Sequence, residues 1–150
     1  MKIARINKTL LEAYSQDKEM LTKSGRPCGI VLKLKYKGEM YNFAVPFRSN
    51  ISKNTPKNQY FPLPNREATK QYNHHGLHYI KMFPVTNNYI EGYSIGKGRS
   101  KTIKRIIDEH EKEIVTACQE YLINYENGIR PKYSTDLDML IKILNKIEEN

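Results

Sequence analysis

The segment from Val45 to Lys53 gathers side chains that suit phosphate chemistry. Arg48, Ser49 and Lys53 follow a strand-like run, and Asn50 adds an amide. A guanidinium can bind two phosphate oxygens, and a hydroxyl can donate to a third or to a sugar. An ammonium can neutralise charge that develops in a transition state. An ordinary Asn/Ser turn flanked by solvated cations explains the same spacing equally well.

Three of the four histidines lie in the run His74-His75-Gly76-Leu77-His78. Zinc would require a fourth ligand and usually a nearby cysteine or carboxylate, and none is close in sequence. His78 heads an apolar run and could act as a general acid or base, although a half-buried histidine packed against a strand is an equal alternative. His110 falls on the apolar side of a helical pattern and is expected in the core. We therefore expect neither a metal site nor a cofactor.

The charge of the chain is unevenly distributed. Its 150 residues carry a formal charge of +9, yet residues 1–105 hold 20 Lys and Arg against 6 Asp and Glu, while residues 106–150 hold 5 against 10. Such a one-sided surplus favours a polyanionic partner, nucleic acid above all, over a surface that is merely soluble.

Few carboxylates are available in the basic region to hold catalytic metal ions. Between Lys23 and Arg105 the acids are Glu39, Glu67 and Glu91, whereas two-metal nucleases gather several carboxylates around their ions. The remaining route to phosphodiester cleavage uses the 2′-hydroxyl of RNA as the nucleophile. It would yield a 2′,3′-cyclic phosphate and a 5′-hydroxyl end.

Aromatic residues are interleaved with the cations, and unpaired bases stack on such rings. Tyr60 and Tyr72 lie among loop residues and are the better stacking candidates, whereas Tyr41 and Tyr79 are expected in the sheet core. The residues predicted to bind RNA are Lys23, Lys33, Lys35, Asn50, Lys57, Tyr60, Arg66, Lys70, Tyr72, Lys81, Lys97, Arg99 and Lys101.

Strand-like patterns fill the first two thirds of the chain and helical patterns the last third. Alternation predicts strands over 2–6, 28–37, 40–47 and 77–85, with Pro46 ending its strand or lying at an edge. Helices are expected from a capping box at residues 9–12, from about residue 96 to 125, and from Ser134 onward. The pattern predicts an α+β fold in one domain, residues 1–150, with a helical part from about residue 100. No apolar run is long enough for a membrane span, no secretion signal opens the chain, and we expect a cytoplasmic protein.

The order of three short motifs resembles the type III toxin family, which includes ToxN and AbiQ, and most resembles its CptN branch. These motifs are Gly29-Ile-Val-Leu32, Ala44-Val-Pro-Phe-Arg-Ser49 and Gly76-Leu-His-Tyr-Ile-Lys-Met-Phe-Pro84. The resemblance implies a metal-independent endoribonuclease with a compact, strongly bent antiparallel sheet and flanking helices, similar to MazF. It also implies a repeated pseudoknot RNA antitoxin, bound along a basic groove in a closed multimeric protein–RNA assembly.

The family's hydroxyl pair followed by Pro-Lys falls on Arg48-Ser49-Asn50-Ile51, where only the serine is retained. Arg48 replaces a threonine, and Lys53 could fill the place of a missing lysine. A catalytic lysine of the family aligns with Gly25, so that Arg26 or Lys23 could substitute for it. Together with the candidate His78 noted above, the predicted catalytic set is Ser49, Arg48, Arg26, Lys53 and His78.

The leading hypothesis is an endoribonuclease toxin, silenced by a structured RNA, in a system linked to phage defence. A second hypothesis is a non-catalytic RNA-binding module that uses the same cations and tyrosines. A third is a sheet-edge interaction protein whose basic character is incidental.

Overall fold

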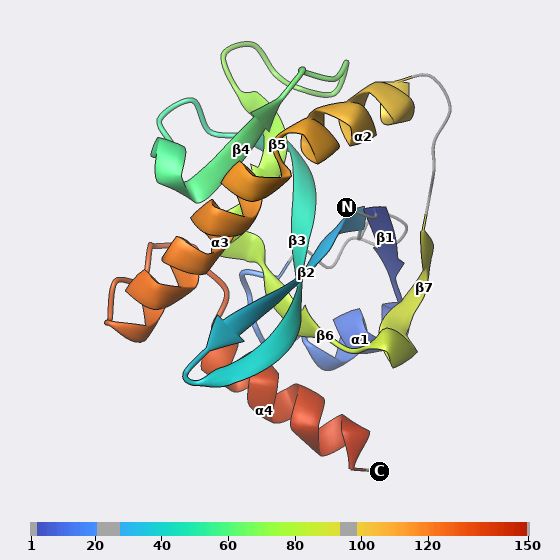
Figure 1. Cartoon of the computed structure of the whole chain (residues 1–150), viewed down its shortest axis with the longest axis vertical. Helices are drawn as coiled ribbons and strands as arrows, with labels where there is room; N and C mark the ends of the chain where they lie inside the picture. Colours follow the sequence, from blue (N-terminus) through green and yellow to red (C-terminus); the bar gives the residue numbers. More distant parts are fainter. Residues whose placement is uncertain (1–2, 21–27, 94–98, 150) are drawn as a thin grey trace.

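One long strand, β3 (Glu39–Ile51), organises the fold because it pairs with three other strands. β2 (Cys28–Tyr36) runs antiparallel to it up to the pair Gly29 and Pro46, while β6 (Phe83–Val85) and β5 (His74–His78) pair with its middle and its end. Figure 1 shows β3 running through the centre of the sheet. The segment that carries Arg48 and Ser49 is therefore held inside a sheet.

The structure, a computed structural model, describes residues 3–20, 28–93 and 99–149, with the backbone alone at 28, 93, 99 and 100. Within these residues seven antiparallel strands form one sheet in the order β4-β5-β3-β2-β1-β7, with β6 beside β3, and four α-helices flank it. The predicted α+β class is confirmed. The remaining strands are β1 (Ile3–Ile6), β4 (Tyr60–Leu63) and β7 (Ile90–Tyr93), the helices are α1 (Lys8–Ala13), α2 (Arg99–Glu109), α3 (Glu111–Glu126) and α4 (Leu137–Glu148), and three short 3₁₀ turns are η1 (Lys57–Gln59), η2 (Tyr79–Lys81) and η3 (Asn87–Tyr89).

Apolar side chains form two clusters. In β2 the buried Leu32 and Leu34 alternate with the exposed Lys33 and Lys35, as predicted for a strand with one solvated face. The larger cluster joins β2, β3 and β5 to α2 and α3, and the smaller one joins β1, β3 and β6 to α1 and α4. Among the described residues, no helix has the length and apolarity needed to cross a bilayer.

β3 continues past Pro46, so the predicted alternative in which the strand ends there is wrong. The β2 ladder stops at the Gly29–Pro46 pair, and β3 continues by pairing Phe47 with Leu77 of β5. The backbones are very close here, because a Cβ added to Gly29 would lie 2.4 Å from the Val45 carbonyl oxygen. A proline is tolerated because it sits where the strand exchanges one partner for another.

Several predicted boundaries are also corrected. The first helix begins at Lys8, because the Asn7 side chain accepts a hydrogen bond from Thr9 N at 2.6 Å, so the predicted capping box does not cap it. The strand predicted over 77–85 is interrupted by η2, and the last helix is capped by Asp136 rather than Ser134.

The long helix predicted up to residue 125 is two helices that meet at His110. His110 is exposed and its ring lies 5.4 Å from the Phe61 ring, so the prediction that it is a core residue is wrong. Apolar spacing continues across the break, and the sequence pattern therefore conceals it.

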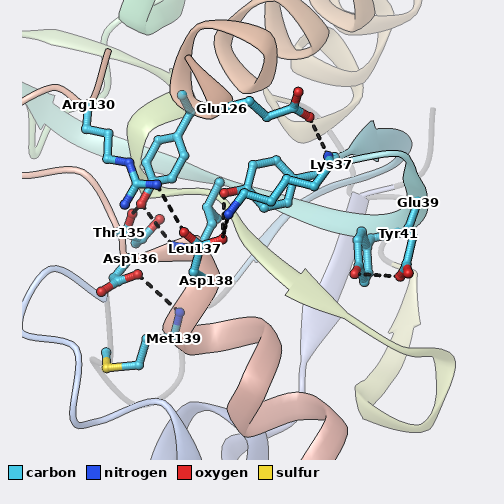
Figure 2. A network of polar contacts seen from close by, with 12 residues as sticks. Lys37, Glu39, Tyr41, Glu126, Arg130, Thr135, Asp136, Leu137, Asp138 and Met139 are labelled. Atoms are coloured by element: carbon cyan, nitrogen blue, oxygen red, sulfur yellow. Dashed lines mark hydrogen bonds and ion pairs between the residues drawn. The ribbon is translucent and has the colours of Figure 1, made fainter. Parts of the chain in front are cut away.

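Asp138 in the first turn of α4 ties that helix to the β2–β3 hairpin (Figure 2). Its carboxylate accepts from the Tyr36 hydroxyl at 2.8 Å and lies 2.9 Å from Lys37 Nζ and 3.0 Å from Arg130 Nη2. Glu126 accepts a further hydrogen bond from the Lys37 backbone. The ammonium of Lys37 is thus paired with a carboxylate of the protein itself.

Gly76→Ala tests the close approach of β4 and β5. A Cβ at residue 76 would lie 2.1 Å from the Phe61 carbonyl oxygen, so the two strands would have to separate. We expect the free energy of unfolding to fall by about 3 kcal/mol. Gly38→Ala is the control, because Gly38 has φ +82° and open space around it, and alanine there should cost about 1 kcal/mol. Urea unfolding measures both, and equal losses would contradict the close approach.

Candidate functional site

A β-bulge in β3 contains Ser49. Arg48 pairs with Gly76 and Ile51 pairs with His74, which is three residues along β3 against two along β5. One extra residue is therefore inserted between Arg48 and Ile51, which covers Ser49 and Asn50. Bulges re-aim side chains and are common next to active sites. The strand predicted to end at residue 47 therefore continues to Ile51, and the loop begins beyond it.

Arg48 and His78 lie on neighbouring strands at this end of the sheet. Arg48 is opposite Gly76, two residues before His78, so the side chains of Arg48 and His78 belong to the same face. His78 is 4% exposed, and neither ring nitrogen has a hydrogen-bond partner among the described residues. Burial, together with the charges of Arg48 and Lys81, lowers the pKa of His78 to about 3. Its imidazole is therefore neutral at physiological pH.

Lys81 is buried, although the sequence suggested an RNA-binding cation. Its Nζ donates to the Tyr133 carbonyl oxygen at 2.8 Å and lies 3.5 Å from Glu19 Oε1. Burial lowers the pKa of Lys81, and Glu19 opposes that shift. Because its ammonium already has two protein partners inside the fold, Lys81 offers no exposed charge to a ligand. Neither partner is close to it in sequence, so no pattern could have revealed this pairing.

Asn50 is the centre of a hydrogen-bond network. Its Nδ2 donates to the Ala68 carbonyl oxygen at 2.9 Å, and its Oδ1 accepts from Lys70 N at 2.7 Å and from Asn73 Nδ2 at 3.3 Å. Asn65 adds bonds to His75 N at 3.1 Å and to the Asn73 carbonyl oxygen at 3.3 Å. The amide of Asn50, predicted to bind RNA, therefore holds the 64–73 loop against the bulge.

The 64–73 loop and the loop that follows β3 present exposed cations. Figure 1 shows both loops at the β4 and β5 end of the sheet. Lys53 Nζ lies 5.7 Å from the centroid of the Tyr72 ring, and Tyr72 is 69% exposed. Lys57, Arg66 and Lys70 are also exposed there. This end of the sheet thus combines an exposed ring with four cations.

Tyr60 does not lie in a loop. It belongs to β4, is buried, and stacks on the His74 ring at 5.2 Å with 25° between the planes. His75 is buried as well, and its Nδ1 lies 2.9 Å from the Pro64 carbonyl oxygen. The prediction that Tyr60 lies in a loop and stacks on RNA bases is corrected.

The other predicted RNA-binding residues are dispersed. Lys33 and Lys35 are exposed on β2, and Lys101 is exposed on α2, whose first residue is Arg99. Arg26, Lys23 and Lys97 lie outside the described residues. Of the proposed catalytic set, the structure brings Arg48, Ser49 and His78 to one end of the sheet, and Lys53 follows in the adjoining loop.

No group of three or more His, Cys, Asp or Glu side chains placed to hold a metal ion occurs among the described residues. Cys118 is buried and its burial raises the pKa of the thiol, so it is not a reactive thiolate.

Comparison with protein-family models and with curated protein sequences gives no match. Among solved structures, the chain is similar to one described as "A processed non-coding RNA regulates a bacterial antiviral system". The two chains share 12% sequence identity with a TM-score of 0.68, over 95% of this chain and 96% of the other. The likeness supports a ToxN-like α+β fold, in agreement with the architecture expected from the sequence.

His78 makes stability depend on pH. An unfolded histidine has a pKa near 6.5, so below that pH the unfolded chain binds a proton that the folded chain does not. Stability is therefore lost as pH falls from about 6.5 toward 3. The contribution of His78 should make the free energy of unfolding about 2 kcal/mol lower at pH 5 than at pH 7. In His78→Leu that difference should shrink by the same amount, as measured by urea denaturation at both pH values. A pH dependence unchanged by the substitution would contradict the burial of a neutral imidazole.

Proposed function

We propose that the chain is a metal-independent endoribonuclease toxin of a type III toxin–antitoxin system. The observation that carries the proposal is the β-bulge that contains Ser49. Ser49 has the one hydroxyl that the family resemblance marks, and it directly follows Arg48 in the chain. The likeness to a solved structure of an RNA-regulated antiviral system supports it. Neither Arg48 nor Ser49 is fully buried, so both offer polar groups to a bound phosphate.

The proposed reaction is an internal transesterification of RNA. The 2′-oxygen attacks the adjacent phosphorus and loses its proton, the bond from phosphorus to the 5′-oxygen breaks, and that oxygen takes up a proton. Negative charge grows on the non-bridging oxygens in the transition state. The Arg48 guanidinium and the Ser49 hydroxyl stabilise that charge, because groups already fixed by the sheet need little reorganisation. Arg26 is a further candidate for this role.

His78 has a more restricted role in this proposal. With a pKa of about 3 it carries almost no proton at neutral pH, so it cannot act as the general acid. Both ring nitrogens are buried, which also separates them from an RNA bound at the surface. We therefore assign His78 to the support of the site rather than to proton transfer.

The proposed inhibitor is an RNA of pseudoknot repeats that closes with several toxin copies into one assembly in the cytoplasm. The structural neighbour's description as a system regulated by a non-coding RNA supports an RNA partner. The exposed lysines of β2, α2 and the two loops supply positive charge for such a partner. Release of counterions from the RNA would make this binding weaken as salt increases.

Ser49→Ala tests the catalytic assignment. Loss of one hydrogen-bond donor to the transition state should lower the cleavage rate about 100-fold or more. Affinity for the same RNA should stay nearly constant, because the cations remain. Ser52→Ala is the matched control, because Ser52 is an exposed loop serine three residues further along the chain. Rates from single-turnover cleavage and affinities from filter binding would decide. A Ser49→Ala variant that cuts at the normal rate would remove this serine from the mechanism.

The second candidate is a non-catalytic RNA-binding module. The exposed Tyr72 and its surrounding cations favour it as much as they favour an enzyme, because they describe binding alone. Affinity measurements cannot separate the two functions. A wild-type protein that binds RNA but yields no cleaved ends under any condition would establish the second candidate.

A further inference from the structure

Tyr72 occupies a backbone conformation that suits glycine or asparagine better than tyrosine. Asn73 N donates to the Lys70 carbonyl oxygen at 3.0 Å, which closes a β-turn with Tyr72 in its third position. Tyr72 has φ 71°, and a positive φ at this position favours Gly or Asn. A side chain there is disfavoured by about 1–2 kcal/mol. Since Tyr72 is mostly exposed, burial of its ring does not offset that strain.

Asn50 fixes this turn on both sides of Tyr72. Its Oδ1 accepts from Lys70 N before the tyrosine and from Asn73 Nδ2 after it. Its Nδ2 donates to the Ala68 carbonyl oxygen, two residues before the turn begins. Because Asn50 directly follows Ser49 in the bulge, the exposed ring is tied to the same bulge as the proposed catalytic serine. The turn therefore presents an aromatic surface at a defined place beside the site.

The charge around Tyr72 identifies what the ring can bind. The Lys53 ammonium is the ring's one cation–π partner among the described residues, and Lys57, Arg66 and Lys70 are exposed on the same two loops. Between Glu39 and Glu91 the sequence holds a single acid, Glu67. A ligand suited to these groups has a flat π face joined to an anion, as an unpaired nucleotide has.

We propose that Tyr72 and Lys53 form a nucleotide subsite beside the cleavage site. The ring stacks on an unpaired base of the bound RNA, and the Lys53 ammonium binds an adjoining phosphate. The inference rests on the proposed function, because it takes the ligand to be the RNA that the enzyme cuts. It makes Lys53 a binding residue and removes it from the catalytic set.

Tyr133 provides an internal comparison. It too is exposed, has φ 72°, stands third in a turn closed by Ser134 N and the Pro131 carbonyl oxygen, and has Lys132 Nζ 5.1 Å from its ring. Its conformation has a structural reason, because its carbonyl oxygen accepts from the buried Lys81. The charges near it in the sequence are mixed, with Arg130 and Lys132 before it and Asp136 and Asp138 after it. Tyr133 thus shares the local geometry of Tyr72 without the surplus of positive charge around Tyr72.

Substitution of Tyr72 tests the subsite. The probe is a short single-stranded RNA that the wild type cuts, and for binding the same RNA with a 2′-deoxynucleotide at the cleaved position. Tyr72→Ala should raise Kd and KM about 5- to 100-fold, the range expected for one lost base stack, and leave kcat within a few fold. Tyr72→Phe should restore affinity to within about 2-fold of wild type, because the ring is kept. Tyr133→Ala should leave Kd and KM unchanged.

Tyr72→Gly separates binding from folding. Glycine relieves the strain at φ 71°, so the urea midpoint should not fall, yet RNA affinity should drop as far as in Tyr72→Ala. Lys53→Ala should raise KM at constant kcat. A fall of kcat at saturating RNA would return Lys53 to the catalytic set and overturn its place in the subsite.

The outcomes distinguish the two proposals. If the wild type cuts RNA and Tyr72→Ala binds and cuts equally well, the subsite is wrong while the enzyme remains. If the wild type binds RNA without cutting it, the affinities of the Tyr72 variants still test stacking, and only the catalytic proposal fails. If the wild type neither binds nor cuts RNA, both proposals are overturned.

Discussion

The one-residue offset between β3 and β5 is the feature on which the site depends. Gly76 permits β4 to approach β5 more closely than any side chain would allow, and β3 meets β5 with one residue in excess. That excess takes Ser49 out of the regular ladder and leaves the amide of Asn50 available to bind the adjacent loop. A regular strand at this place would alternate its side chains between the two faces and offer neither arrangement.

At this end of the sheet the buried and the exposed basic side chains differ in how their charge is handled. Lys81 is neutralised inside the fold by Glu19, and His78 avoids a charge by giving up its proton. Arg48 lies beside the bulge and is not fully buried, and the lysines of the two loops are exposed. A bound polyanion would therefore meet positive charge at the surface without a buried countercharge to displace. This distribution fits a site that stabilises developing negative charge.

Regular patterns in the sequence predicted much of the fold, and long-range contacts account for what they missed. Alternation in β2 was enough to predict a strand with a solvated face, because period-two burial is a local property. The bulge depends on the register of β5, and the burial of Lys81 depends on Glu19, 62 residues away. Local composition cannot encode either relation. The resemblance marked Ser49 as a candidate, whereas the hydrogen bonds of Asn50 and the turn at Tyr72 became visible only in three dimensions.

The central claim is that the chain positions an RNA strand so that its own 2′-hydroxyl breaks it. Analysis of the cleaved ends in the presence of EDTA tests this most directly, with one substrate all RNA and a second carrying a single 2′-deoxynucleotide before the broken bond. The account predicts undiminished cutting of the first into 2′,3′-cyclic phosphate and 5′-hydroxyl ends, and no cutting of the second at that bond. Cleavage that stops in EDTA, or that proceeds through the deoxy position, would contradict it.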